Sequence, residues 1–487
     1  MTRAKEVVGA TGVLLLLWVG GSMNVDLDVW HSMALVREAL REGRMPMQDP
    51  FAYTPTVEPV VHHEWGNGVI LYAVGTHGGL AGLQALRLAL VGTAVWFVIA
   101  TARRRGAHAG LLILLGPLAA GMSWIGLTAV RPQLVTLTFL AALLWSLERD
   151  RQGRRLPWWV WAPAFVVWAN IHGGFVVGAL FVAVHAAEQW VRGARVGHLL
   201  VLLALVAAGV AVNPYGLAYY PYLWEALRLE RPLIIEWRPL WEAHPLGIAM
   251  VVLALLLAAY ATLRVGVRRL PGWILLALAA YAAIRHERHV SILALVWAAY
   301  VPAALAATAL GERMERTFAR WGWPIAIALC LSALAGLVGG RGWELRVPAT
   351  RADSSRPYPV GAEQYLREQH VRGNVMTSFS TGAYLTWKLH PRVKVSLDGR
   401  FEAAYAPSLL AEHLDFYHGA PDWQAIRDRY PTDLILVERG WEAERALRDE
   451  GRWSLVYEDD TFLLFARPGL SLPYQDRRGA RFEGTFP

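Results

Sequence analysis

The stretch VVGATGVLLLLWVGGSMNVDLD, residues 7–28, decides the fold, because a long apolar run ends at two acidic residues. Residues 7–23 are apolar enough to cross a bilayer as one helix. The carboxylates of Asp26 and Asp28 are costly to hold beside lipid, so such groups usually face water or a binding site. The stretch therefore predicts a retained membrane span whose far end presents two acids.

The rest of the chain continues this pattern of apolar blocks. Of its 487 residues, 55% are hydrophobic, and the mean hydropathy of +0.31 is far too high for an ordinary soluble enzyme. The composition predicts an α-helical polytopic membrane protein with about eleven transmembrane helices. Their expected ranges are 7–23, 80–102, 107–124, 128–147, 156–171, 173–190, 198–212, 246–263, 270–284, 289–309 and 322–340.

Arginine clusters set the expected orientation of these helices. The net charge is +8, but much of the basic excess lies in short loops, so it does not indicate nucleic acid as a partner. Basic loops usually stay in the cytoplasm, and here they occupy every second connection. The N-terminus is therefore expected to be cytoplasmic. The basic clusters are Arg3 with Lys5, Arg103 to Arg105, Arg149 to Arg155, Arg192 with Arg195, Arg264 to Arg269, and Arg313 to Arg320.

The remaining connections are then expected on the outer face of the membrane. The Arg- and Ala-rich composition is typical of a bacterial chain, which would make this the outer face of a bacterial cytoplasmic (inner) membrane. Residues 341–487 would lie in the periplasm, as an extracytoplasmic domain. The expected division is thus a membrane domain, 1–340, which includes an outer loop at 24–79, and a soluble domain, 341–487.

Most of the chemically unusual residues fall on this outer face. In loop 24–79, residues 29–43 have apolar positions at helical spacing and end at Gly43, which predicts an amphipathic helix. Forked guanidinium groups bind phosphate oxygens well. Ordinary interfacial or ion-paired side chains are the alternative. The candidate substrate-binding residues are His62, His63, Glu64, Arg131, His172, Arg285 and Arg288.

The acids have two possible roles at such a site. Asp28 or Asp26 can act as a general base toward an acceptor. Alternatively, Asp28 and Glu64 can join a histidine around a divalent cation, Mg²⁺ or Mn²⁺. His62 and His63 are adjacent and lack the spacing of a zinc protease motif, so hydrogen bonding by this pair remains the competing interpretation.

The segment 341–487 predicts a small soluble α/β domain, because charges of both signs interleave with short helix and strand patterns. Asp398-Gly399-Arg400 follows a predicted strand, where loops of α/β folds carry function. It could bind substrate, or it could be a tight turn closed by a local salt bridge. Helices are expected at 363–369, 423–429 and 442–449, and strands at 374–378, 393–397, 434–437, 453–457 and 461–466.

The order of these parts resembles the GT-C superfamily of polytopic membrane glycosyltransferases. The segment from Asp28 to Leu40, with Arg37 and Glu38 near its end, is similar to the protein-mannosyltransferase and aminoarabinose-transferase branches. That resemblance places the catalytic acid on Asp28, with Asp26 as second choice. The chain departs from the branches by having Asp28-Val29 in place of their Asp-Glu pair.

The resemblance implies that a sugar is transferred, with inversion, from a polyprenyl-phosphate-linked donor to a glycan, lipid or protein acceptor. The leaving phosphate would then account for the arginines. Walker A, kinase, GxSxG and GxGxxG motifs are missing from the sequence, so nucleotide-driven pumping and hydrolase chemistry lack support. A metal-independent ligase or polymerase of lipid-linked glycans remains one alternative. A non-enzymatic lipid or glycan translocator or assembly scaffold remains another.

Overall fold

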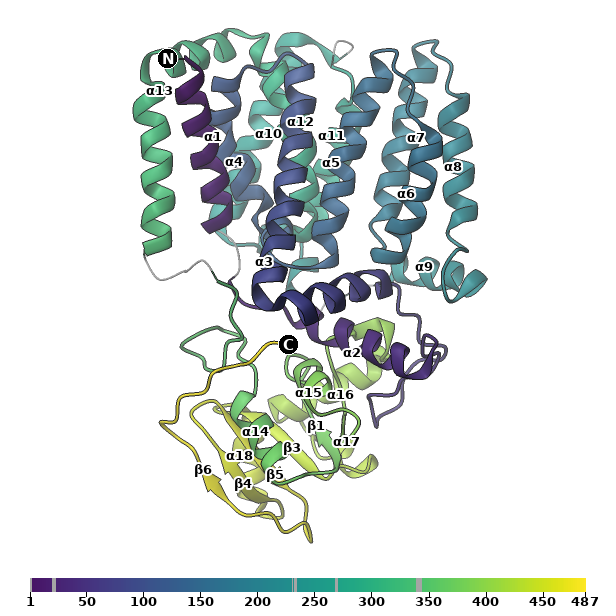
Figure 1. Ribbon diagram of the computed structural model, residues 1–487, viewed down its shortest axis with the longest axis vertical. Helices are drawn as coiled ribbons and strands as arrows, with labels where there is room; N and C mark the ends of the chain where they lie inside the picture. Colours follow the sequence, from purple (N-terminus) through teal and green to yellow (C-terminus); the bar gives the residue numbers. More distant parts are fainter. Residues whose placement is uncertain (1, 20–22, 230, 232–233, 268–269, 339–343) are drawn as a thin grey trace. The chain divides into compact units, whose positions relative to one another are not determined.

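Two units of the chain pack separately in the computed structural model (Figure 1). The structure describes residues 2–19, 23–229, 231, 234–267, 270–338 and 344–487. The first unit, which we call the bundle, comprises Met1–Met23 and Gln84–Glu344. The second, which we call the α/β unit, comprises Asn24–Leu83 and Leu345–Pro487. The outer loop expected at 24–79 thus packs with the C-terminal residues, and the expected boundary at 340–341 falls outside the described residues.

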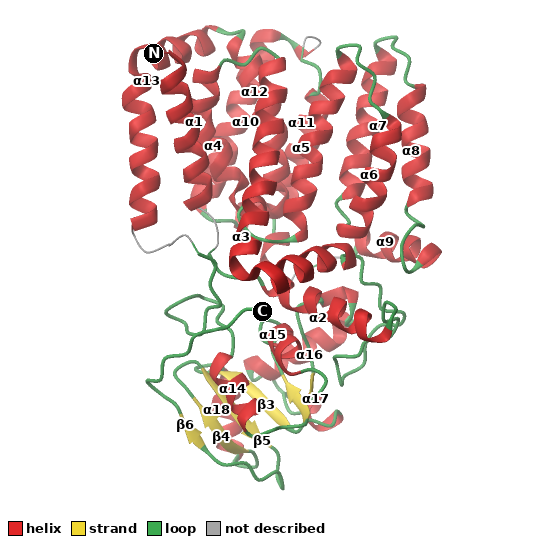
Figure 2. Ribbon diagram, viewed as in Figure 1, coloured by secondary structure: helices red, strands yellow, loops and turns green. Residues whose placement is uncertain are grey.

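Each apolar segment expected from the sequence coincides with a helix in the described part of the chain (Figure 2). The ends of two segments, at 20–22 and 339–340, lie outside the described residues. The helices are α1 (Thr2–Val19), α3 (Trp65–Arg104), α4 (Ala109–Leu127), α5 (Pro132–Arg151), α6 (Trp158–Ile171), α7 (Phe175–Val191), α8 (Gly197–Gly209), α10 (Pro245–Val265), α11 (Trp273–Arg285), α12 (Val290–Ala306) and α13 (Ala309–Gly336).

The chain is a multi-pass membrane protein. Among the described residues, 4 helices are long and apolar enough to cross a membrane: Trp65–Arg104, Pro245–Val265, Glu287–Ala306 and Ala309–Gly336. Other apolar helices, such as α7 and α8, are shorter. The expected number of about eleven crossings therefore stays a prediction.

Ion pairs and hydrogen bonds link several of the basic connections at one end of the bundle. Arg105, just after α3, pairs with Glu148 of α5 at 2.8 Å. Arg151 at the end of α5 pairs with Glu188 of α7 at 3.0 Å, and Glu188 also accepts a hydrogen bond from the backbone of Gly272 before α11. This clustering agrees with the alternation of loops in the sequence, while the side that faces the cytoplasm stays a prediction.

The α/β unit begins with the predicted amphipathic helix, α2 (Leu27–Glu42), which ends at Gly43 in a left-handed conformation. The first turns of α3 follow after an irregular segment. Within α3, Gly79 has φ 57° and ψ −151°, which breaks the helix near the boundary between the two units. Only glycine adopts such a conformation at little cost. Gly79 therefore permits the break in α3.

The C-terminal part of this unit is a 6-stranded sheet with the order β2-β1-β3-β5-β4-β6. β1 is parallel to β2 and β3, β5 is antiparallel to β3 and β4, and β6 is parallel to β4. The strands are β1 (Gly373–Met376), β2 (Val393–Val395), β3 (Leu434–Glu438), β4 (Ser454–Glu458), β5 (Phe462–Ala466) and β6 (Gln475–Asp476).

The helices of the sheet region only partly follow the expectation. α14 (Val360–Glu368), α17 (Ala425–Arg429) and α18 (Glu442–Glu450) confirm the three expected helices to within a few residues. α15 (Gly382–Leu389) and α16 (Pro407–His418) were not expected. α16 has a start signal in Pro407 and a stop signal in Gly419.

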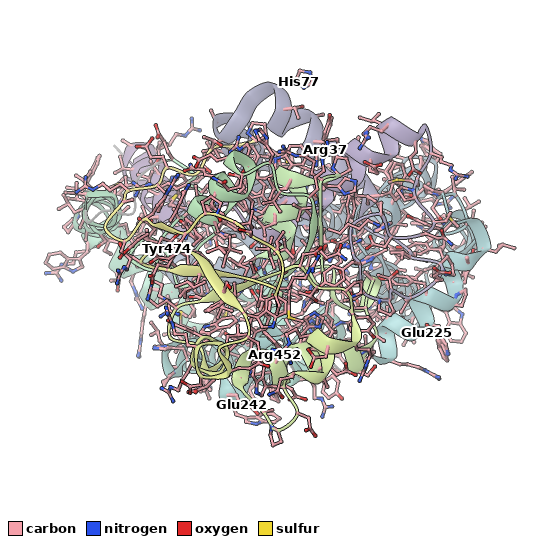
Figure 3. All side chains as sticks on the ribbon, turned by 90° about the horizontal axis from the view of Figure 1, so that it is seen from below. Arg37, His77, Glu225, Glu242, Arg452 and Tyr474 are labelled. Atoms are coloured by element: carbon pink, nitrogen blue, oxygen red, sulfur yellow. The ribbon has the colours of Figure 1, made fainter. Side chains whose placement is uncertain are left out.

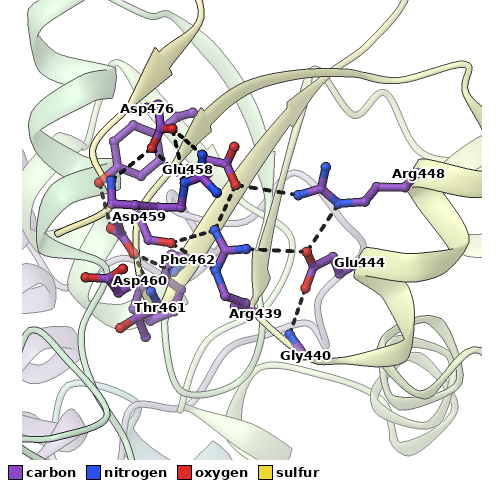
Figure 4. A network of polar contacts seen from close by, with 12 residues as sticks. Arg439, Gly440, Glu444, Arg448, Glu458, Asp459, Asp460, Thr461, Phe462 and Asp476 are labelled. Atoms are coloured by element: carbon purple, nitrogen blue, oxygen red, sulfur yellow. Dashed lines mark hydrogen bonds and ion pairs between the residues drawn. The ribbon is translucent and has the colours of Figure 1, made fainter.

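An acidic turn, Glu458-Asp459-Asp460, joins β4 and β5. Asp459 accepts hydrogen bonds from the backbone N–H groups of Thr461 and Phe462, and from the Tyr457 hydroxyl (Figure 4). Arg439 donates to Glu458 and to the Asp459 carbonyl. These contacts satisfy the polar groups of the turn between β4 and β5. The side chains of Tyr474 and Arg452 are exposed (Figure 3).

Candidate functional site

Asp26 and Asp28 occupy different positions at the start of α2. Asp26 is the N-cap, and its Oδ1 accepts a hydrogen bond from the Asp28 backbone N–H at 3.1 Å. Asp28 lies in the first turn, where the helix dipole stabilises a negative charge. Both residues are half-buried. The structure therefore gives Asp26 a capping role and leaves Asp28 as the acid presented by the helix.

The chain around these acids is held to the C-terminal residues. Asn24 forms a β-bridge with Arg346, and the Val25 N–H donates to the Arg346 carbonyl at 2.8 Å. The Tyr358 hydroxyl donates to the Val25 carbonyl at 2.8 Å. On α2 itself, Trp30 is fully buried between aromatic rings, including that of Tyr358. The first turn of α2 is thus built into a rigid element, as a positioned catalytic group requires.

Segment 24–79 also extends the sheet. Val395 of β2 donates to the Phe51 carbonyl, and Tyr53 donates to the Val395 carbonyl, both at 3.0 Å. Residues 51–53 therefore pair with the edge of β2 as an added strand. This pairing explains why loop 24–79 packs with residues far along the chain.

A buried ion-pair cluster lies beside this added strand. Arg400 donates through Nε to Asp398 at 2.9 Å and through Nη2 to Asp49 at 3.1 Å, with a second, shorter contact to Asp49 from Nη1. The Tyr405 hydroxyl accepts from Arg400 Nη2 at 3.0 Å. Asp398 is 0% exposed and Arg400 6%. Asp398 and Arg400 thus form a local salt bridge in their turn, and Asp49 adds a partner from segment 24–79.

The charged groups in the cluster keep one another ionised. Burial disfavours the Arg400 cation, but the carboxylates of Asp398 and Asp49 outweigh burial and raise its pKa well above the ordinary value. Burial alone would raise the pKa of Asp49, yet the positive charge and hydrogen bonds of Arg400 lower it. The guanidinium and the Asp49 carboxylate are therefore ionised together, as buried pairs must be.

Two neutral histidines adjoin the ion pairs. Burial, followed by the positive charge of Arg400, lowers the pKa of His62 to about 3. Burial also lowers the pKa of His31, against the opposing charge of Asp398. Within the described chain, His31 Nδ1 and His62 Nε2 are buried without a hydrogen-bond partner. His31 lies one turn after Asp28 on α2, so the cluster reaches the helix that carries the acids.

The structure thus brings three of the expected site residues together, namely His62, Asp398 and Arg400. Sequence reasoning missed Asp49, His31 and Tyr405. Asp49 stands in a turn-rich run before Pro50, and His31 follows Asp28 at helical spacing. Both were visible as polar residues near a predicted site, but neither belongs to a recognisable motif.

The other two residues of the His62-His63-Glu64 sequence pair with each other. His63 Nε2 lies 3.4 Å from Glu64 Oε1, just before α3, and both side chains are partly exposed. The described residues contain no group of three or more His, Cys, Asp or Glu side chains placed to hold a metal ion. The role of Asp28 and Glu64 as ligands of Mg²⁺ or Mn²⁺ stays a prediction.

The remaining candidates lie at one end of the bundle. Arg131, the N-cap of α5, pairs with Glu236 in a short 3₁₀ helix, Ile235–Trp237. Arg288 stacks over Trp237 of the same helix, with Cζ 4.7 Å from the ring centroid. Gln133 of α5 donates to the Arg288 carbonyl at 3.2 Å. Arg131 and Arg288 are therefore neighbours through a shared aromatic and acidic segment.

His172 and Arg285 are the other two candidate residues at this end of the bundle. His172 Nδ1 lies 2.8 Å from Thr136 Oγ1, one turn into α5. Arg285 is the last residue of α11 and is exposed. The first turns of α5, α7 and α12 face this end, and the positive ends of helix dipoles favour anions. The arrangement suits a phosphate group.

Comparison with known proteins identifies the fold. Neither a family model nor a curated protein sequence matches the chain. Among solved structures, it is similar to the archaeal oligosaccharyltransferase AglB from Archaeoglobus fulgidus in complex with an inhibitory peptide and a dolichol-phosphate. The TM-score is 0.63 at 11% identity, covering 90% of this chain and 69% of that one. An Archaeoglobus fulgidus oligosaccharyltransferase in its apo form gives a TM-score of 0.60 at 12% identity, covering 96% and 75%. The chain thus has a GT-C-like fold, as the sequence predicted.

Proposed function

We propose that this protein is a membrane glycosyltransferase that transfers a sugar from a polyprenyl-phosphate-linked donor to an acceptor on the outer face of a bacterial cytoplasmic membrane. The observation that carries the proposal is the position of Asp28, in the first turn of a rigid helix directly after α1, in a chain with a GT-C-like fold. One structural neighbour was solved with a dolichol-phosphate. That ligand supports a lipid-linked donor for this chain as well.

In the proposed reaction, Asp28 is the general base. Its carboxylate takes the proton of the acceptor hydroxyl as the acceptor oxygen bonds to the anomeric carbon of the donor sugar. The bond between that carbon and the phosphate oxygen breaks, and polyprenyl phosphate leaves with the bonding electrons. Attack opposite the leaving group inverts the anomeric centre. The acceptor is a glycan, a lipid or a protein, and membrane lipids surround the donor.

Stabilising the leaving phosphate is the second requirement. Arg131 and Arg288 are the proposed ligands, because both belong to one polar cluster at the end of the bundle. Arg285 and His172 are proposed as additional contacts at that end. Guanidinium groups stabilise a phosphate most when charge develops on it during bond breaking.

The buried cluster has a different proposed task. Arg400, Asp398 and His62 are enclosed by protein, so we propose that they support the acid-bearing helix and do not touch substrate. His63 and Glu64 are partly exposed and remain proposed substrate contacts.

Hydrolysis of a polyprenyl-phosphate-linked sugar tests the function without knowledge of the acceptor, because water can take the acceptor's place, give its proton to Asp28 and bond to the anomeric carbon. Purified full-length protein is expected to release polyprenyl phosphate and free sugar, and the Asp28→Asn variant is expected to lose that activity while keeping the wild-type Tm. Movement of intact donor across vesicles, unaffected by Asp28→Ala, would instead indicate a translocator.

A further inference from the structure

The turn Asp398-Gly399-Arg400 contacts the first turn of α2 directly. An ideal Cβ built on Gly399 would lie 2.2 Å from Leu27 Cδ1 and 3.6 Å from His31 Nδ1. Real Cβ atoms do not approach other heavy atoms to within 3.0 Å, so the terminal methyl group of Leu27 would have to move. Glycine at 399 therefore lets the turn lie against the Leu27 side chain in the first turn of α2.

The residues touched by Gly399 lie on either side of Asp28 in sequence. Leu27 and His31 are four apart on α2, so they share one face of the helix, and that face meets the turn. Asp28 follows Leu27 directly and projects about 100° further round the helix. Any shift of the Leu27 face therefore moves the Asp28 carboxylate.

The turn cannot easily give way. Arg400 is bonded to Asp398 on its own turn and to Asp49 on the outer loop. The Leu397 carbonyl before the turn accepts from Thr377 Oγ1 at 2.6 Å. Breaking a buried charge pair is costly, so extra volume at position 399 is expected to displace Leu27 on α2 and not the turn.

We propose that Gly399 is a positioning residue for Asp28. Because glycine has no side chain, the rigid turn Asp398-Gly399-Arg400 can lie against the first turn of α2. This contact sets the position of the Asp28 carboxylate. The catalytic meaning of this contact rests on the proposed function, whereas the contact itself can be tested without it. Misplacement of a catalytic group by about 1 Å can cost a hundredfold in rate, so a single methyl group at 399 should matter.

Gly399 is suited to a clean substitution. It does not belong to the glycines with positive φ, so alanine can adopt its backbone conformation. Leu27 is the nearest obstacle, so the Leu27→Ala change should relieve the clash. Gly78 lies in the same unit, and a Cβ added to it would meet nothing within 4 Å, so Gly78→Ala is the matched control.

The position of residue 28 can be followed by thiol chemistry in the full-length chain. An Asp28→Cys variant in a Cys330→Ser background places a thiol at a helix N-terminus, where its reactivity depends on its surroundings. The rate of alkylation by iodoacetamide is measured in three proteins that carry this thiol. One has Gly399, one has Gly399→Ala, and one has both Gly399→Ala and Leu27→Ala. We expect Gly399→Ala to change the rate by about threefold or more, the double substitution to restore it, and Gly78→Ala to leave it unchanged.

Each outcome decides the proposal. An unchanged rate in Gly399→Ala, or a changed rate that Leu27→Ala does not restore, would overturn it. Should Gly399→Ala fail to fold, a folded double variant with the original rate supports the proposal, and a second failure to fold overturns it. In the enzyme with Asp28 intact, Gly399→Ala is expected to lower kcat for release of polyprenyl phosphate with little change in KM. Activity retained by Asp28→Asn would refute the proposed base and leave the thiol result standing.

Discussion

Arg400 and Asp49 are 351 residues apart in sequence, yet the Arg400 guanidinium donates hydrogen bonds to both carboxylate oxygens of Asp49 within the α/β unit. Asp398 accepts from the same guanidinium. This pair joins the outer loop to the C-terminal sheet, and the turn that holds Arg400 contacts α2 through Gly399. The placement of Asp28 therefore depends on residues at both ends of the chain.

Loss of the Arg400 side chain should be strongly destabilising. In an Arg400→Met variant, the carboxylates of Asp49 and Asp398 would stay buried without their cation, which typically costs about 3 to 5 kcal/mol. A large fall in the Tm of the purified protein is expected. Arg429, which pairs with Glu412 at the surface, is the control, and Arg429→Met should change the Tm little. Equal effects of the two substitutions would show that the buried cluster does not hold the unit together.

Stability should fall in mild acid because of the buried histidines. The pKa of His62 is about 3 in the folded chain and near its ordinary value of 6.5 when unfolded. Between these values the unfolded chain binds a proton that the folded chain does not, so folding becomes less favourable as the pH falls from 6.5 toward 3. His31 acts in the same direction. The lowered pKa of Asp49 adds a loss only at lower pH, as its carboxylate is protonated.

The dependence can be measured as the Tm at a series of pH values from 7.5 to about 5, across the ordinary titration range of histidine. His62→Gln should flatten the decline, because it removes one of the titrating groups. The exposed His418 is the matched position, and His418→Gln should retain the wild-type slope. A His62→Gln variant with an unaltered slope would contradict the neutral, buried state of this side chain.

Donor binding should depend on the arginines at the end of the bundle. Arg288→Ala and Arg131→Ala are each expected to weaken the binding of polyprenyl phosphate by about tenfold, the loss of one charge-assisted contact. Arg288→Lys should restore binding only in part, since lysine lacks the forked geometry and the stacking on Trp237. Arg264, at the end of α10, provides a control in Arg264→Ala. Binding that survives both alanine variants would move the phosphate site elsewhere.

Much of this fold could be predicted from local patterns. Apolar blocks identified the helices of the bundle, and short apolar runs between charged residues identified β1 to β5, because burial in lipid or in a sheet requires apolar side chains. The salt bridge between Asp398 and Arg400 was also foreseeable, since the two residues are two apart on a turn. α15 was missed because it is buried almost throughout, so it has no polar face to give an amphipathic pattern.

Contacts between distant segments could not be predicted in this way. Nothing local to Asp49 indicates Arg400 as its partner, and nothing in residues 51–53 indicates that they pair with β2. Such contacts depend on how the whole unit packs. The same limit applies to Gly399, whose importance arises from Leu27 and not from its own backbone conformation.

The most direct test of the central claim compares the two acids at the start of α2. Asparagine is as good an N-cap as aspartate, so Asp26→Asn should preserve both the helix and most of the activity. Asp28→Asn should fold with the wild-type Tm and release no polyprenyl phosphate from a polyprenyl-phosphate-linked sugar, because the base is gone. Release by Asp28→Asn at the wild-type rate would contradict the account.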